Sequence, residues 1–258
     1  MFPAGGLYAG ETLTFTRDAA GRATRASLAG VIFKRRAVSP EEGNIFRITP
    51  VRPLDALRTE AMAATPPAEA GDFRAADLVE LAPLDPTLIL DVRYATVDNF
   101  MGVPFYRQAR AFLQRPAAEA LLRVQADLRA AGYGLIVYDG YRPWWVTKMF
   151  WEATPDALKE FVANPANGSR HNRGCAVDVG LYEQASGKPA EMPSGYDEFT
   201  PRAYADYPGG TDRSRYHREL LRDVMEKHGF TINPGEWWHF DYRDWRSYAI
   251  QNDAFEAL

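Results

Sequence analysis

The feature that most constrains this chain is a short polar run, SRHNRGCAVD at 169–178, in which a histidine and an aspartate lie seven residues apart. The Asn-Arg-Gly in its middle is typical of a turn, and the residues from Ala176 onward alternate like a strand. A turn that leads into a strand would bring His171 beside Asp178, and the small residues Gly174 and Ala176 would let the backbone approach closely. This run therefore predicts two polar ligands held side by side.

A second polar cluster, EWWH at 236–239, lies near the C-terminus. In a strand, His239 shares a face with Trp237 and Asp241, whereas Glu236 would face away from it on regular pleating. A bend where this strand begins is therefore required if Glu236 and His239 are to approach one metal.

Together the two runs supply the ligand set of an open zinc site and a general base. His171, Asp178 and His239 would leave the fourth position of a tetrahedral Zn²⁺ for water, and Glu236 could take the proton of that water. The competing interpretation is that these are hydrogen-bonded polar residues beside a Trp-rich core. The joint presence of both runs favours the metal site, with one Zn²⁺ per chain as cofactor.

The remaining histidines and the single cysteine need no metal. His217 and His228 lie in a polar helix predicted over 214–228, where surface or helix-end positions account for them. Cys175 has no evident neighbouring base to form its thiolate, so a small buried residue is favoured over a catalytic thiol. One cysteine excludes an internal disulfide and fits a reducing compartment without proving one.

Composition and charge restrict the partners. The chain has 258 residues, of which 46% are hydrophobic and 25% charged, which is typical of a soluble globular protein. The net charge of −4 gives no basic footprint for nucleic acid. No apolar run would span a bilayer and no signal peptide is visible. We expect a cytoplasmic protein, or a periplasmic one if the N-terminus is incomplete. We expect no nucleic-acid or membrane partner. The sequence does not indicate the oligomeric state.

The chain divides into two regions of different character. Residues 1–70 are predicted to be a β-rich appendage and linker of unknown role, with strands within 7–36 and at 46–51 and a helix at 53–63. Residues 71–258 are predicted to be the catalytic domain, where short strands and separated helices favour an α+β fold. Its predicted strands are 78–81, 88–92, 133–138, 230–232 and 237–242; its predicted helices are 116–131, 144–151, 155–163 and 214–228, with a long loop at 185–213. The run KRR at 34–36 is predicted to be a solvated edge.

Four runs of the sequence resemble conserved blocks of a known family. The runs at 169–178 and 236–239 resemble the paired signatures of the zinc D-alanyl-D-alanine dipeptidases of the VanX type, relatives of the zinc D-Ala-D-Ala carboxypeptidases. Those signatures are shared across cell-wall peptidases and hedgehog-like domains. Two further runs, DVRYATVDNF at 91–100 and DGYRP at 139–143, resemble blocks of the dipeptidase branch. The likeness extends from about residue 78 to the end and leaves residues 1–70 outside it.

The resemblance implies a central antiparallel sheet flanked by helices, of the hedgehog or DD-peptidase type. It implies that His171, Asp178 and His239 bind zinc, that Glu236 is the catalytic base, and that Arg142 stabilises the oxyanion. An alternative for Arg142 is a structural ion pair with Asp139, and both hold if Asp139 orients the arginine.

The resemblance also implies how a zwitterionic dipeptide is held. Tyr94 and Asp197 would meet its ammonium end, and Ser169 and Tyr106 its carboxylate end, although Asp197 is equally consistent with an exposed loop acid. The loop 185–213 would exclude larger peptides. The implied function is hydrolysis of D-Ala-D-Ala. The alternatives are a D,D-carboxypeptidase acting on longer peptidoglycan peptides, and a non-catalytic zinc-binding or peptide-binding module, against which Glu236 and Arg142 argue.

Overall fold

The computed structural model describes residues 10–19, 21, 23–34 and 45–258. Arg35 and Arg36 of the predicted charge run, and parts of the predicted β-rich stretch 7–36, lie outside the described residues. Two compact units are present, Met1–Glu42 and Gly43–Leu258.

The first unit contains an antiparallel sheet of three strands within the stretch 7–36 that is predicted to be β-rich. The strands are β1 (Thr14–Arg17), β2 (Ala23–Leu28) and β3 (Val31–Lys34), paired in the order β1-β2-β3. Ala29 and Gly30 join β2 to β3 with φ of 50° and 80°. Two consecutive positive φ angles are the geometry of a type I′ hairpin turn, whose twist matches that of the strands it connects.

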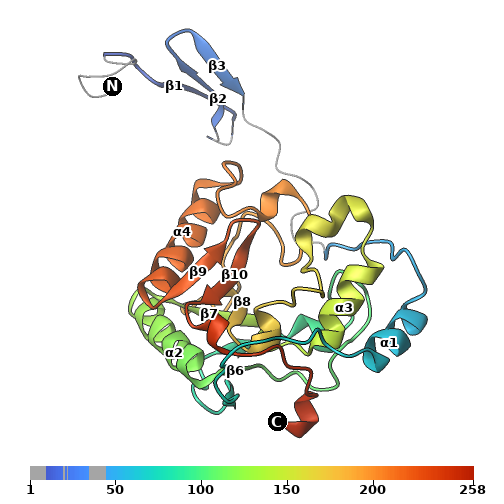
Figure 1. Cartoon of the computed structure of the whole chain (residues 1–258). Coiled ribbons are helices and arrows are strands. Elements are labelled where there is room, and N and C mark those ends of the chain that lie inside the picture. The colour runs from blue at the N-terminus through green and yellow to red at the C-terminus, as the bar shows by residue number, and fades with distance from the viewer. Residues whose placement is uncertain (1–9, 20, 22, 35–44) are drawn as a thin grey trace. The chain divides into compact units, whose positions relative to one another are not determined.

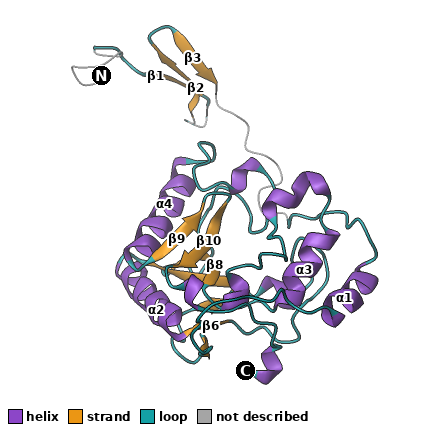
Figure 2. Ribbon diagram, in the orientation of Figure 1, coloured by secondary structure: helices purple, strands orange, loops and turns teal. Residues whose placement is uncertain are grey.

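The second unit is built on a five-stranded sheet with the order β5-β7-β8-β10-β9 (Figure 2). Strand β5 runs parallel to β7, and the other neighbours are antiparallel, so the sheet is mixed. A separate pair joins β4 to β6. The bounds are β4 (Leu78–Glu80), β5 (Ile89–Leu90), β6 (Phe112–Gln114), β7 (Tyr133–Asp139), β8 (Ala176–Glu183), β9 (Phe230–Asn233) and β10 (Glu236–Tyr242).

Helices α2 (Arg115–Ala130) and α4 (Asp212–Lys227) lie on one side of this sheet (Figure 1). Helix α2 packs on β7 and α4 on β9, because each presents an apolar face at helical spacing. Helix α4 begins at Asp212, two residues before the start of the predicted helix 214–228. Thr211 is the N-cap, and its hydroxyl accepts from the Ser214 amide in a reciprocal capping box.

On the other side of the sheet lie α3 (Trp144–Ala153) and α1 (Leu54–Ala63), which pack against each other (Figure 1). The apolar face of α1 is fully buried through Leu57 and Ala61, so this helix is part of the core of the second unit. The compact units thus divide after residue 42, whereas the predicted boundary lies at residue 70. The functional role of residues 1–70 stays a prediction.

Two predicted elements take another form. Residues 46–51 form no strand, and two of their amides instead bond to distant carbonyls, Ile48 to Phe100 and Val51 to Ala153. The predicted helix 155–163 is a 3-10 helix over Asp156–Phe161. The whole is a mixed fold of helices and sheets. Among the described residues, no helix has the length and apolarity needed to cross a membrane.

Candidate metal centre and active site

Three predicted ligands meet at one point of the central sheet. The Nε2 atom of His171 lies 3.1 Å from Nδ1 of His239 and 3.3 Å from Oδ1 of Asp178. The distance from His239 Nδ1 to Asp178 Oδ1 is 3.1 Å. Ligand atoms bound about 2.0–2.1 Å from a tetrahedral zinc are separated by roughly 3.3 Å, so the three atoms already lie at the corners of such a polyhedron. This buried group can hold a metal ion.

The outer nitrogen of each imidazole has a partner that determines the tautomer. His171 Nδ1 lies 2.7 Å from the carbonyl oxygen of Gly140, to which it donates. His239 Nε2 lies 2.9 Å from Oδ1 of Asp241 and donates to that carboxylate. In the neutral form of each ring, this tautomer leaves the inner nitrogen with the free lone pair that a metal requires.

Local backbone geometry brings His171 and Asp178 together as predicted. His171 lies in a 3-10 helix, His171–Arg173, that Gly174 ends with a left-handed φ of 67°. A Cβ atom at Gly174 would lie 2.4 Å from Cδ2 of Leu78, so the glycine is required by space as well as by conformation. Strand β8 follows, and in its pairing with β10 Asp178 stands directly opposite His239.

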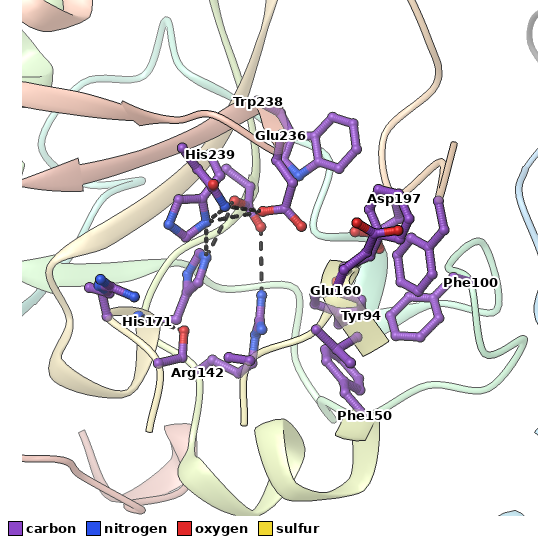
Figure 3. A pocket seen from close by; sticks show the side chains of 18 residues that line it. Tyr94, Phe100, Arg142, Phe150, Glu160, His171, Asp197, Glu236, Trp238 and His239 are labelled. Carbon is purple, nitrogen blue, oxygen red and sulfur yellow. Dashed lines mark hydrogen bonds and ion pairs between the residues drawn. The ribbon is translucent and has the colours of Figure 1, made fainter. Parts of the chain in front are cut away.

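The bend that Glu236 requires is present in β10. Glu236 pairs with Asn233 and Phe240 pairs with Ile232, so β10 advances four residues where β9 advances one. This bulge rotates Glu236 out of the regular pleat. Its Oε2 comes within 3.7 Å of His239 Nδ1, and Figure 3 shows its carboxylate turned toward the same centre as His171 and His239.

The Glu236 carboxylate is suited to exchange a proton near neutral pH. Only 16% of the side chain is exposed. Burial raises the pKa of Glu236 to about 7, and the nearby Asp178 carboxylate acts in the same direction. Asn233 opposes this effect because its Nδ2 donates to Oε2 at 3.0 Å and stabilises the anion.

Arg142 forms the ion pair with Asp139 that was considered for it, and its side chain also reaches the pocket. Its Nε donates to Asp139 Oδ2 at 2.8 Å, and its Nη2 lies 3.6 Å from Asp178 Oδ2. Figure 3 shows Arg142 beside His171, with its side chain directed into the pocket. The guanidinium also stacks against the rings of Tyr94 and Phe150, at 5.2 and 5.0 Å from their centroids. The side chain thus forms the ion pair with Asp139 and still lines the pocket.

A bulge in β7 places Asp139, because the register of β7 against β8 shifts between Val137 and Asp139. Its second oxygen, Oδ1, accepts from Tyr106 at 2.9 Å. Tyr106 does not line the pocket that contains the metal ligands, so the structure places it behind Asp139 instead of at a substrate carboxylate. Asp139 is buried, so its carboxylate requires hydrogen-bond donors, and the Tyr106 hydroxyl is one of them.

Tyr94 and Asp197 meet on the side of the pocket away from the two histidines (Figure 3). The Tyr94 hydroxyl donates to Asp197 Oδ2 at 2.8 Å. Asp197 is buried, not an exposed loop acid, and has a left-handed φ of 57° that is strained for a residue with a Cβ. Burial, together with the Asp178 charge, holds the pKa of Asp197 well above its usual range, because both disfavour the carboxylate anion.

The pocket that these side chains enclose is small, with a volume of about 170 Å³. This is below the roughly 300 Å³ at which pockets for drug-sized ligands begin. Ser169 lines it, and the predicted loop 185–213 contributes Asp197 and Phe199. Residues 160–163 form a further wall that was not predicted, where Phe161 stacks on Phe199 at 5.2 Å between centroids.

Comparison with known proteins agrees with this geometry. The family described as D-ala-D-ala dipeptidase, peptidase M15, matches residues 74–256.

The chain belongs to the D-Ala-D-Ala dipeptidase family.

Two relatives in this family span most of their own length in the comparison. A D-alanyl-D-alanine dipeptidase of Escherichia coli K12 is 35% identical over 70% of this chain and 93% of its own. One of Enterococcus faecium is 33% identical over 60% of this chain and 85% of its own. The solved structure of the LdcB LD-carboxypeptidase is 22% identical over 67% of this chain and 71% of that chain, with a TM-score of 0.38, a likeness too distant to add to the family assignment.

In this dipeptidase family member, two histidines and the cysteine lie apart from the metal centre, as predicted. His228 Nε2 pairs with Asp127 at 2.7 Å at the end of α4. His217 is fully buried, which corrects its predicted surface position; its Nδ1 donates to the Glu191 carbonyl at 2.8 Å. Cys175 is buried, and burial raises the pKa of its thiol to about 12, so it is no thiolate.

Sequence reasoning missed three residues that support the site. Asp241 orients His239, and its period-two spacing from that histidine was the available signal. Asn233 contacts Glu236 from the last position of β9. Tyr196 donates to Asp178 Oδ2 at 3.0 Å, and no spacing in the sequence indicates this contact because it comes from the long loop.

Proposed function

We propose that the chain is a zinc-dependent dipeptidase that hydrolyses D-Ala-D-Ala with Glu236 as general base. The observation that carries the proposal is that a metal-ligand triad, a carboxylate with a pKa near 7 and a buried guanidinium line one small pocket. A structural metal site requires neither of the last two groups. The family membership supports the same reaction.

Zinc held by His171, Asp178 and His239 supplies Lewis-acid polarisation of the scissile carbonyl and acidifies the attacking water. Glu236 lies beside this centre, so its carboxylate takes the proton of the water and delivers it to the leaving amine. A pKa near neutrality suits both halves of this transfer, because the group gives up the proton as readily as it accepts it.

Arg142 stabilises the negative charge that develops on the carbonyl oxygen. The guanidinium is held by Asp139 and by two aromatic rings, so little reorganisation is needed when the charge forms. Tyr106 positions Asp139 by donating a hydrogen bond to it. We propose this role for Tyr106 in place of the predicted contact with the substrate carboxylate.

The two ends of the dipeptide meet opposite walls in this proposal. Asp197, supported by the Tyr94 hydroxyl, receives the ammonium group, and Ser169 lies at the carboxylate end. An acidic side chain thus faces the ammonium end of the zwitterion, and a hydroxyl group faces its carboxylate end. The four antiparallel strands β7, β8, β10 and β9 support the DD-peptidase-like architecture that the resemblance implies. The cytoplasmic location and the absence of nucleic-acid and membrane partners stay predictions.

An amine-release assay tests the proposal by comparing D-Ala-D-Ala, L-Ala-L-Ala and N-acetyl-D-Ala-D-Ala. We expect hydrolysis of the free D,D-dipeptide to be faster than that of the other two by about 100-fold or more, because the acetylated compound lacks the ammonium group that Asp197 binds. Faster cleavage of the acetylated compound would assign a D,D-carboxypeptidase. No cleavage of any of them by the zinc-loaded protein would leave a non-catalytic module.

A further inference from the structure

A second and larger pocket lies outside the active site, with a volume of about 630 Å³. It is lined by α1, by the first residues of α3, by the segment 104–107 and by the C-terminal residues 254–256. Helices α1 and α3 lie side by side in Figure 1. The volume is within the roughly 300–1,000 Å³ of pockets that hold small organic ligands.

This pocket depends on a part of the chain that the family match does not include. Arg58 and Met62 come from α1, which precedes the matched residues 74–256. The remaining walls belong to the matched region. A helix added by the N-terminal segment therefore creates the cavity, and the family activity does not account for it.

Arg58 gives the pocket its chemical character. Its guanidinium stacks on the rings of Phe105 and Trp145, at 5.3 and 5.7 Å from their centroids. Its Nη2 donates to the carbonyl oxygen of Pro104 at 2.6 Å, and within the described part of the chain no carboxylate lies at ion-pair distance from it. Burial lowers the pKa of Arg58 from its ordinary value, and the charge of the Asp55 carboxylate offsets this only in part.

The Arg58 guanidinium is oriented before any ligand arrives, because it lies over both rings and donates to the Pro104 carbonyl. Its unused N–H groups lie in the plane of the fork, which is the arrangement that a carboxylate recognises through two parallel hydrogen bonds. The other charged side chains of the lining, Arg107 and Glu256, are exposed and opposite in sign, so Arg58 leaves the lining with one net positive charge.

The rest of the lining is apolar and aromatic. Phe105, Tyr106 and Phe255 are buried residues that contribute ring surface, and Trp145 adds a half-buried indole. The hydroxyl of Tyr106 already donates to Asp139, so this residue offers its ring and not its polar group. A ligand that fits must therefore combine one anionic group with an apolar body.

We propose that this pocket is a second ligand site, which binds a small organic carboxylate with an aromatic body. The carboxylate pairs with the Arg58 guanidinium, and the aromatic group packs among Trp145, Tyr106 and Phe255. The site lies apart from the metal centre, and its ligand need not be a substrate.

The test is calorimetric titration of the full-length protein with 3-phenylpropionate and with the neutral 3-phenylpropanamide. We expect the acid to bind and the amide to bind about tenfold more weakly or not at all, because only the acid pairs with the guanidinium. The Arg58→Gln variant should weaken binding of the acid by about tenfold or more. Arg52→Gln should leave binding unchanged, because Arg52 pairs with Glu60 on the same segment and does not line the pocket.

Three outcomes would overturn the proposal: no heat of binding for the acid up to about 10 mM; equal binding of acid and amide; or full binding by Arg58→Gln. The acid-to-amide comparison uses the unaltered protein, so it decides the question even if Arg58→Gln does not fold. None of these measurements uses D-Ala-D-Ala, so their failure is independent of the proposed hydrolysis.

Discussion

Glu236 Oε2 lies 3.7 Å from His239 Nδ1, although both residues belong to one strand and regular pleating would turn them to opposite faces. The register shift between Glu236 and Phe240 produces this proximity. A straight β10 would keep His239 at the metal centre and aim Glu236 elsewhere. The bulge is thus what brings a carboxylate beside the candidate metal ligands.

Glu236→Gln should retain the metal and lose most of the hydrolysis. Glutamine preserves the shape and the contact with Asn233 but accepts no proton, so we expect kcat to fall by about 100- to 10,000-fold. Metal content by elemental analysis should stay at one ion per chain. Glu160→Gln is the matched control, because Glu160 lines the same pocket from an exposed position and should retain kcat. A near-native kcat for Glu236→Gln would exclude this carboxylate as the base.

The pH dependence of kcat/KM should report the same carboxylate. Glu236 must be ionised to accept a proton, so activity should rise with pH through the pKa of this group and then level off. Burial places that pKa at about 7, and a bound cation would lower it, so the acidic limb should be centred at or below about pH 7. A kcat/KM that is flat from about pH 5 to about pH 8 would contradict the assignment.

Much of this centre could be predicted because its ligands occur in two compact runs. His171 and Asp178 are joined by one turn, so spacing alone indicates that they meet. The position of Glu236 could not be predicted, because the bulge arises from the pairing of β10 with β9 and not from the local sequence. The hydrogen bond from Tyr106 to Asp139 could not be predicted either, because it joins residues 33 positions apart that no spacing in the sequence connects.

Asp241→Asn should weaken metal binding. The carboxylate accepts from His239 Nε2 and increases the basicity of the nitrogen that faces the metal. We expect zinc affinity, measured by competition with a chromogenic chelator, to fall by about 10- to 100-fold. Asp244→Asn should change it little, because Asp244 pairs with Arg74 and touches no ligand. Equal affinity in both variants would show that Asp241 has no role in ligation.

Asp197→Asn should impair binding of the free dipeptide specifically. Asparagine keeps an oxygen for the Tyr94 hydroxyl but loses the charge that pairs with ammonium. We expect kcat/KM for D-Ala-D-Ala to fall by about 10- to 100-fold, the range of a charge-assisted hydrogen bond. Any residual cleavage of N-acetyl-D-Ala-D-Ala should be unaffected, since that compound has no ammonium. An equal loss on both substrates would place Asp197 outside substrate recognition.

Gly174→Ala should destabilise the fold more than Gly187→Ala. Both glycines have left-handed φ, 67° and 66°, so both substitutions incur backbone strain of about 1 kcal/mol. Only Gly174 also meets a neighbour, because its Cβ would lie 2.4 Å from Leu78 Cδ2, whereas Gly187 has open space. We expect a further loss of about 1–3 kcal/mol at Gly174 in urea unfolding. Equal losses would mean that the turn relaxes without cost.

The N-terminal boundary was harder to predict than the site. The run 64–71 is rich in alanine and proline and reads as a linker, yet Glu69 within it pairs with Arg173 and accepts from the Ile250 amide at 2.6 Å. Composition indicates how freely a segment bends in isolation. It does not indicate which distant groups the segment binds, so the attachment of these residues to the second unit was not visible in the sequence.

The central claim is that a metal bound by His171, Asp178 and His239 is required for hydrolysis of D-Ala-D-Ala. The most direct measurement is amine release from D-Ala-D-Ala by the purified chain before chelation, after removal of metal, and after addition of Zn²⁺. We expect activity to fall below about 1% on chelation and to return when about one equivalent of Zn²⁺ is added. Full activity in protein shown by elemental analysis to contain no metal would contradict the account.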